Sequence, residues 1–229
     1  MKTQWKCQTL GTLLNLLLLC SCATERSRHP PDVRMNKGAG RADWLIVTLR
    51  LEDGEEMAFI VDTGAPGALF DSSLASKLKR LPLGKWTVAT GLGKEKSAIY
   101  WEPPLFLGNP RLKTGRLCAT FDLSGISEDA GRPIMGVLGM DCLKHYCIQL
   151  DFRSGTLRFL DDTHLDAAKL GQPFPLEFSL FRKLYIRRAS LAGGRTGRLV
   201  VDTGDNGDGQ SSIEGNEAKQ LHLSRCIWA

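Results

Sequence analysis

A run of apolar residues that ends in Asp-Thr-Gly occurs twice in this chain. The first copy is Phe59–Gly64 (FIVDTG) and the second is Leu199–Gly204 (LVVDTG). In each copy the apolar run predicts a buried strand, so the acid that follows stands at the mouth of a core. Gly64 and Gly204 permit a tight turn there and a close approach of the N–H group to the carboxylate. A chain that repeats such a turn can bring Asp62 and Asp202 into one site.

The flanks of the two turns also repeat, which indicates an internal duplication. Each acid is preceded by two strand patterns separated by a turn and is followed by a short helical pattern. Three downstream positions correspond, namely Phe70 with Ile213, Ala75 with Ala218, and Leu78 with Leu221. The second copy lacks a counterpart of residues 116–160. We therefore expect one whole lobe followed by an incomplete second lobe.

The remainder of the first repeat is typical of a small all-β domain. Short apolar segments separated by Gly-rich and polar turns predict many strands, mostly antiparallel, with only brief helices. Among these segments, Cys147–Phe152 and Thr156–Leu160 form a hairpin around the turn Arg153–Gly155. The helical patterns are limited to Phe70–Leu78 and to a turn around Asp141–Tyr146. The predicted fold class is therefore mainly β.

Two carboxylates held face to face have a defined chemistry. They cannot both ionise easily, so they share one proton and titrate at separated pKa values. The ionised acid can take a proton from a water that attacks a carbonyl, while the protonated acid donates to the carbonyl oxygen. We predict this role for Asp62 and Asp202, with Thr63 and Thr203 bracing the turns. Such chemistry requires neither a metal nor a cofactor.

Three segments together resemble the retropepsin-like aspartyl proteases, in particular their bacterial exported branch. They are FIVDTGA, then GVLGMD at Gly136–Asp141, and the hairpin CIQLDFRSGTLRF. The resemblance implies a closed β-barrel lobe in which Asp62 is catalytic and Val137-Leu138-Gly139 threads beneath it. It also implies a flap over residues 86–99, with Gly91 and Gly93 at the tip, and a peptide or protein substrate.

Members of that family complete the acid pair within one chain or between two copies of a single lobe. The second Asp-Thr-Gly favours one chain, although Asp205 stands where the first turn has the small residue Ala65. Because the second lobe is incomplete, two alternatives stay open: a homodimer of first lobes, and a non-catalytic peptide-binding pseudo-protease. A glycosidase, the other two-carboxylate class, ranks behind these.

The N-terminus has the pattern of an export signal. Lys2 and Lys6 precede an apolar run at Leu10–Leu19, which is shorter than the roughly 20 residues that span a membrane. The following Leu-Cys-Ser-Cys resembles a bacterial lipobox, which makes Cys22 the candidate lipidated residue. We expect a protein of the bacterial cell envelope that is attached to the membrane through lipid, and cleavage by an ordinary signal peptidase remains open.

The expected organisation has four parts: a signal peptide at 1–21, a flexible tether at 22–41, a protease lobe at 42–165, and a partial second lobe at 166–229. The net charge is only +5 and basic runs are short, which argues against nucleic-acid binding. The acidic segment Asp202–Glu214 lacks the first and last ligands of a calcium loop, and the four histidines have no ligand spacing.

Overall fold

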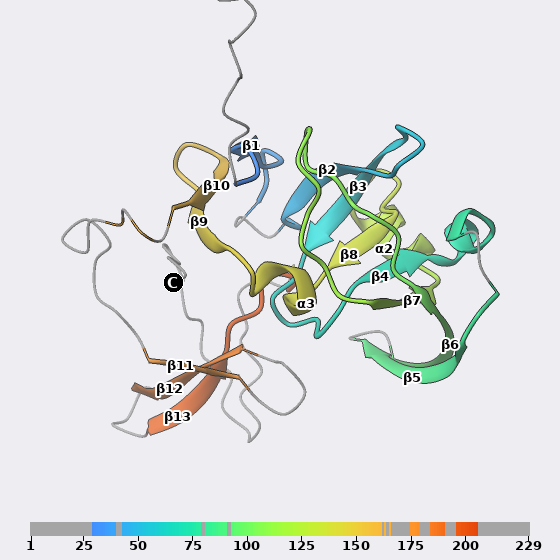
Figure 1. Cartoon of the computed structure of the whole chain (residues 1–229). Coiled ribbons are helices and arrows are strands. Elements are labelled where there is room, and N and C mark those ends of the chain that lie inside the picture. Colours follow the sequence, from blue (N-terminus) through green and yellow to red (C-terminus); the bar gives the residue numbers. More distant parts are fainter. Residues whose placement is uncertain are drawn as a thin grey trace, which may run out of the picture.

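The computed structural model describes residues 29–39, 43–78, 81–90, 93–161, 163, 165, 175–178, 184–190 and 196–205. Their strands form three sheets (Figure 1). One sheet has seven strands in the order β2-β3-β8-β4-β7-β6-β5, and two sheets have three strands each, β1-β10-β9 and β11-β12-β13. With only short helices among the described residues, the structure confirms the predicted mainly β fold class.

The elements run along the chain with the following bounds. They are β1 (Val33–Arg34), β2 (Ile46–Arg50), β3 (Glu56–Val61), β4 (Leu69–Asp71), the 3-10 helix η1 (Ser72–Leu78), β5 (Gly84–Thr90), β6 (Gly93–Trp101), β7 (Leu117–Phe121), α2 (Ser124–Asp129), β8 (Gly136–Leu138), α3 (Met140–Leu143), β9 (Cys147–Asp151), β10 (Thr156–Leu160), β11 (Leu176–Phe178), β12 (Leu184–Ser190) and β13 (Thr196–Val200). None of the described helices is long and apolar enough to cross a membrane.

Strand β3, which leads into Asp62, is buried on both faces. Met57, Phe59 and Val61 point into the larger hydrophobic core. Ala58 and Ile60 point into a second, smaller core on the other face. A strand covered on both sides has no polar face, which explains why this segment is a continuous apolar run rather than an alternating one.

The described strands pair mostly antiparallel, as predicted, but two strand pairs of the large sheet are parallel. They are β3 with β8 and β4 with β7. The β3–β8 register pairs Val61 with Leu138, so Asp62 and Gly139 follow at the same edge of the sheet. The Asp62 N–H donates to the Leu138 carbonyl at 3.0 Å, and the Met140 N–H donates to the Ala65 carbonyl at 2.8 Å. The late segment 136–140 is thereby fixed directly beneath the first Asp-Thr-Gly turn.

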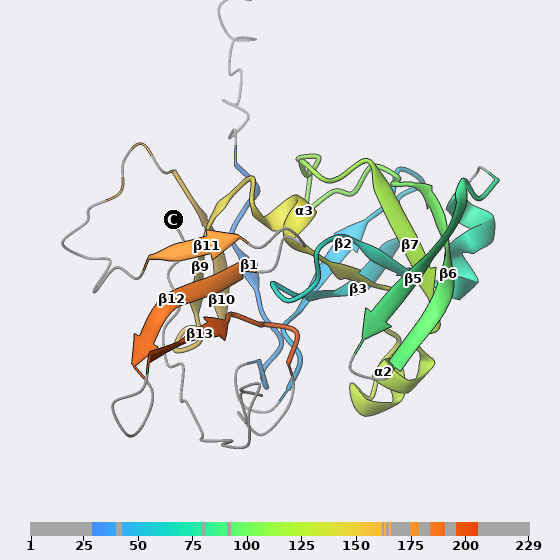
Figure 2. The same cartoon turned by 90° about the horizontal axis from the view of Figure 1, so that it is seen from below.

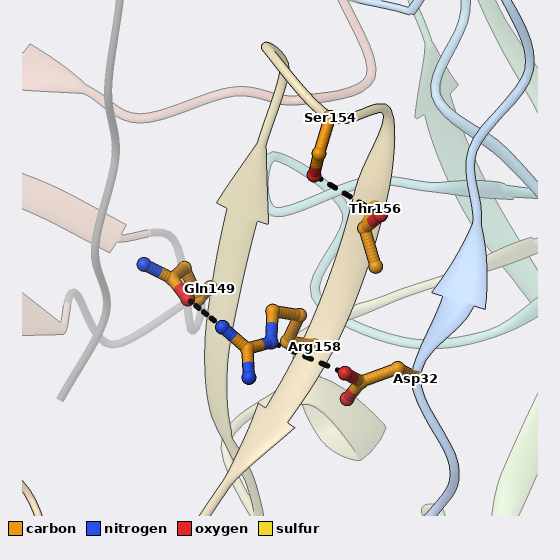
Figure 3. A network of polar contacts seen from close by, with 5 residues as sticks. All are labelled: Asp32, Gln149, Ser154, Thr156 and Arg158. Carbon is orange, nitrogen blue, oxygen red and sulfur yellow. Dashed lines mark hydrogen bonds and ion pairs between the residues drawn. The ribbon is translucent and has the colours of Figure 1, made fainter.

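The expectation of a flexible tether over residues 22–41 is wrong for residues 29–39. Strand β1 pairs antiparallel with β10, and Met35 and Ala39 are buried in the larger core. Asp32 accepts a hydrogen bond from Arg158 Nε at 3.1 Å, and Arg158 also reaches Gln149 across the hairpin (Figure 3). The segment is ordered because it covers the open edge of the β9–β10 hairpin, a contact that its own composition does not reveal.

The described part of the second repeat is a three-stranded antiparallel sheet, visible beside the larger sheet in Figure 2. Its strands β12 (Leu184–Ser190) and β13 (Thr196–Val200) correspond to the two strand patterns predicted before Asp202. The predicted leader, Cys22, Gly91 and every residue after Asp205 lie outside the described residues. Export, lipid attachment and the extent of the second lobe therefore stay predictions from the sequence.

The docking of the N-terminal segment can be tested with Met35→Ala. Removal of a buried Met side chain should lower the free energy of unfolding by about 2–5 kcal/mol, because it leaves a cavity in the core. The exposed neighbour Lys37 provides the control, since Lys37→Ala should change stability by less than about 0.5 kcal/mol. Equilibrium denaturation measures both variants. Equal, negligible effects would contradict the packing of this segment.

Candidate active site

The first Asp-Thr-Gly turn holds its acid by backbone hydrogen bonds. Asp62 follows β3 and is half-buried. Its Oδ1 accepts the N–H of Gly64 at 2.6 Å and the N–H of Ala65 at 3.0 Å. The second turn repeats this contact, because Asp202 Oδ1 accepts the N–H of Gly204 at 2.9 Å. Both carboxylates are thus fixed by the turns that the glycines make possible.

Thr63 and Thr203 join the two turns by reciprocal hydrogen bonds. The hydroxyl of Thr63 accepts the N–H of Thr203 at 3.0 Å and donates to the Val201 carbonyl at 2.7 Å. The hydroxyl of Thr203 accepts the N–H of Thr63 at 3.1 Å and donates to the Val61 carbonyl at 2.7 Å. Each threonine therefore holds the opposite turn. The role of the Val61 and Val201 carbonyls could not be predicted from the sequence, where each valine is marked only by its place immediately before an acid.

The glycine of each turn packs against the acid of the other turn. A Cβ atom on Gly64 would lie 2.3 Å from Oδ2 of Asp202. A Cβ atom on Gly204 would lie 2.2 Å from Cγ of Asp62. No side chain fits at either position, which gives a spatial reason for glycine in both copies of the repeat. The close approach also places the two carboxyl groups next to each other.

The contact between the carboxyl groups changes the acidity of Asp62. Burial, the negative charge of Asp202 and a hydrogen bond between the two side chains raise the pKa of Asp62 from 3.8 to about 7. The N–H groups of Gly64 and Ala65 oppose this shift, because they stabilise the ionised form. The raised pKa favours the protonated form of Asp62 up to about neutral pH.

The structure brings together six of the predicted site residues, namely Asp62, Thr63, Gly64, Asp202, Thr203 and Gly204. Gly93 is the first residue of β6. Strands β5 and β6 pair antiparallel, with Thr90 opposite Gly93 and Gly84 opposite Ile99, so the segment predicted as a flap is a hairpin. Asp205 is exposed beside the second turn. Over the described part of the chain, no three His, Cys, Asp or Glu side chains gather in a way that could hold a metal ion.

Comparison with protein families identifies a relationship for the part of the chain that carries the first turn. A family model described as "Aspartyl protease" matches residues 47–142, which include the first Asp-Thr-Gly, the hairpin of β5 and β6, and the Gly136–Asp141 segment. Over residues 47–142 the chain is thus similar to the aspartyl proteases. This match confirms the family predicted from the sequence. Asp202 and the rest of the second repeat lie outside the matched residues.

Solved structures that resemble the chain include two proteins of related description. A retropepsin-like aspartic protease from Rickettsia conorii is 16% identical with a TM-score of 0.38, covering 56% of this chain and 87% of that one. The retroviral protease-like domain of Ddi1 from Leishmania major is 13% identical with a TM-score of 0.32, covering 54% of this chain and 98% of that one. A comparison with curated proteins finds no match.

The threonine contacts between the two turns can be tested with Thr63→Val. Valine keeps the shape of the side chain but leaves the Thr203 N–H and the Val201 carbonyl without their partner. We expect a loss of about 2 kcal/mol or more in the free energy of unfolding. Thr63→Ser should lose less because it keeps the hydroxyl, and Thr48→Val, at an exposed position of β2, is the control. Denaturation that does not separate Thr63→Val from this control would refute the described contacts.

Proposed function

We propose that this protein is an aspartic-type peptidase in which Asp62 and Asp202 together activate a water molecule for hydrolysis of a peptide bond. The observation that carries the proposal is the hydrogen-bonded contact between these two carboxyl groups, each on its own Asp-Thr-Gly turn. Both acids belong to the same chain, which favours a single-chain acid pair over a homodimer of first lobes. The aspartyl protease family of residues 47–142 supports the class of reaction.

The two acids have different surroundings, which suggests a division of roles. Asp62 is half-buried and its raised pKa keeps the shared proton on it, whereas Asp202 is exposed. Asp202 would then accept a proton from the attacking water while Asp62 donates its proton to the carbonyl oxygen. Collapse of the tetrahedral intermediate breaks the C–N bond and passes a proton to the leaving amine. The acid pair ends the cycle with one proton.

The hairpin of β5 and β6 is suited to contact an extended peptide. It forms one end of the seven-stranded sheet, so the outer edge of β5 is open among the described residues. The approach to β5 and the strand itself carry exposed apolar side chains at Leu81, Leu83 and Trp86. We propose that this hairpin closes over a bound peptide.

The catalytic assignment predicts that Asp62→Asn and Asp202→Asn each abolish peptide cleavage. An amide can neither share the proton nor act as the base, so kcat should fall on the order of 100-fold or more. Cleavage of a denatured protein substrate, followed by mass spectrometry of the fragments, provides the measurement. Asp129→Asn, at an exposed position of α2, should behave as the unchanged chain does. Full activity in either acid variant would exclude the proposed pair.

The shared proton predicts a pH dependence of cleavage. The active pair carries one proton, and the pKa of Asp62 is about 7. Because a fully ionised pair has no acid to donate, kcat/KM should fall about tenfold for each pH unit above about 7. Circular dichroism at each pH would show that the chain stays folded. A constant kcat/KM between pH 6 and 9 would contradict proton sharing at this site.

A further inference from the structure

A second pair of carboxyl groups lies inside the protease domain, apart from the proposed catalytic acids. Glu102 follows β6, and Asp141 lies in α3 with 2% of its surface exposed. Both carboxyl oxygens of Glu102 are buried and make no hydrogen bond of ordinary geometry. Its carboxyl group interacts with the Thr114 hydroxyl and the Asp141 carboxyl. A buried acid in such a place is stable only if it is protonated or shares a proton.

Asp141 links this pair to the loop that carries Asp62. Its Oδ1 accepts the N–H of Cys142 at 2.9 Å, and its Oδ2 accepts the N–H of Ala68 at 3.4 Å. Ala68 belongs to the segment that leaves the first Asp-Thr-Gly turn. The residue before Asp141, Met140, donates its N–H to Ala65 in the same segment. The position of Asp141 therefore bears directly on the backbone behind Asp62.

Glycines enclose the two carboxyl groups. A Cβ atom on Gly115 would lie 2.3 Å from Oδ2 of Asp141 and 3.1 Å from Oε2 of Glu102. A Cβ atom on Gly67 would lie 3.4 Å from Oδ2 of Asp141. The backbone at Gly115 therefore packs directly against both carboxyl groups, and the backbone at Gly67, in the loop of Asp62, lies near Asp141.

The titratable groups around the pair identify Glu102 as the one that changes charge near neutral pH. Burial, followed by the charge of Asp141, raises the pKa of Glu102 from 4.5 to about 8. The thiols of Cys118 in β7 and Cys142 in α3 are buried, and their pKa values are raised by burial and by both carboxylates. His145 interacts with Asp141, but burial and the charges of Lys144 and Lys113 lower its pKa.

We propose that Glu102 and Asp141 are a positioning pair that shares one proton and holds the loop of Asp62 in its active geometry. In the proton-sharing state Glu102 donates to Asp141, while Asp141 accepts the N–H groups of Ala68 and Cys142. Loss of the proton places two negative charges together in a buried site and weakens the support of the loop. The effect on catalysis rests on the proposed peptidase function, whereas the proton sharing itself does not.

The stability of the folded chain tests the proton sharing without any assay of activity. Because the pKa of Glu102 is higher in the folded state, stability should fall as pH rises from about 4.5 to about 8 and should then level off. Asp62→Asn serves as the background, since it removes the titration of the other acid pair. Two chains are compared, Asp62→Asn alone and Asp62→Asn combined with Glu102→Gln. Between pH 5 and pH 8 the folding equilibrium constant of the single variant should fall at least about tenfold more than that of the double variant.

Controls make this test decisive. Glu128→Gln, at an exposed position of α2, should leave the pH dependence of the Asp62→Asn background unchanged. If the Glu102→Gln variant does not fold, carboxyl carbon NMR of Asp62→Asn gives the same answer, since one glutamate should titrate near pH 8. Equal pH dependences with and without Glu102→Gln, or glutamates that all titrate below pH 6, would overturn the proposal.

The positioning role is tested by kinetics. Glu102→Leu removes the donor and should lower kcat about tenfold or more with a smaller change in KM, because the loop of Asp62 moves while the substrate surface remains. Glu102→Gln, which keeps an N–H donor, should restore most of that loss. Equal kcat values in the leucine variant and the unchanged chain would refute the positioning role. If the unchanged chain cleaves no peptide, the peptidase proposal fails, and the stability test still decides whether the pair shares a proton.

Discussion

The site depends on the reciprocal hydrogen bonds between Thr63 and Thr203. Each hydroxyl accepts an N–H and donates to a carbonyl of the opposite turn, so neither turn can move without breaking contacts of the other. A typical hydrogen bond contributes only about 1 kcal/mol, and the larger effect is the cost of leaving its buried partner unpaired. These contacts therefore fix the geometry of Asp62 and Asp202, and removing one of the hydroxyls also costs stability.

Close placement of acids has the same electrostatic consequence at two points of the domain. Asp62 faces Asp202, Glu102 faces Asp141, and in each pair burial and the neighbouring charge raise a carboxyl pKa toward or above neutrality. One backbone segment connects the pairs. Residues 65–68 follow the first Asp-Thr-Gly turn and hydrogen-bond to Met140 and Asp141. A change of protonation in the inner pair can therefore reach the outer one through a few peptide groups.

The sequence predicted the parts of this arrangement that leave a local pattern. The repeated Asp-Thr-Gly, the apolar runs before it and the hairpin at residues 147–160 all follow from periodicity and turn residues. Contacts between distant segments leave no such pattern, so the packing of residues 29–39 and the parallel pairing of β3 with β8 were missed. Glu102 was missed for the same reason, since an isolated glutamate before Pro-Pro gives no sign of being buried.

The asymmetry of the two turns gives the proposed mechanism its direction. Two identical, equally buried carboxyl groups would hold a shared proton equally well. In this structure the surroundings differ, because the first turn lies against the two cores of the large sheet and the second turn follows a small three-stranded sheet. Desolvation penalises the charged form where burial is greater, which favours the protonated form of Asp62. In the proposed mechanism the repeat supplies two similar acids, and the unequal scaffolds around them would determine which one acts first as acid and which as base.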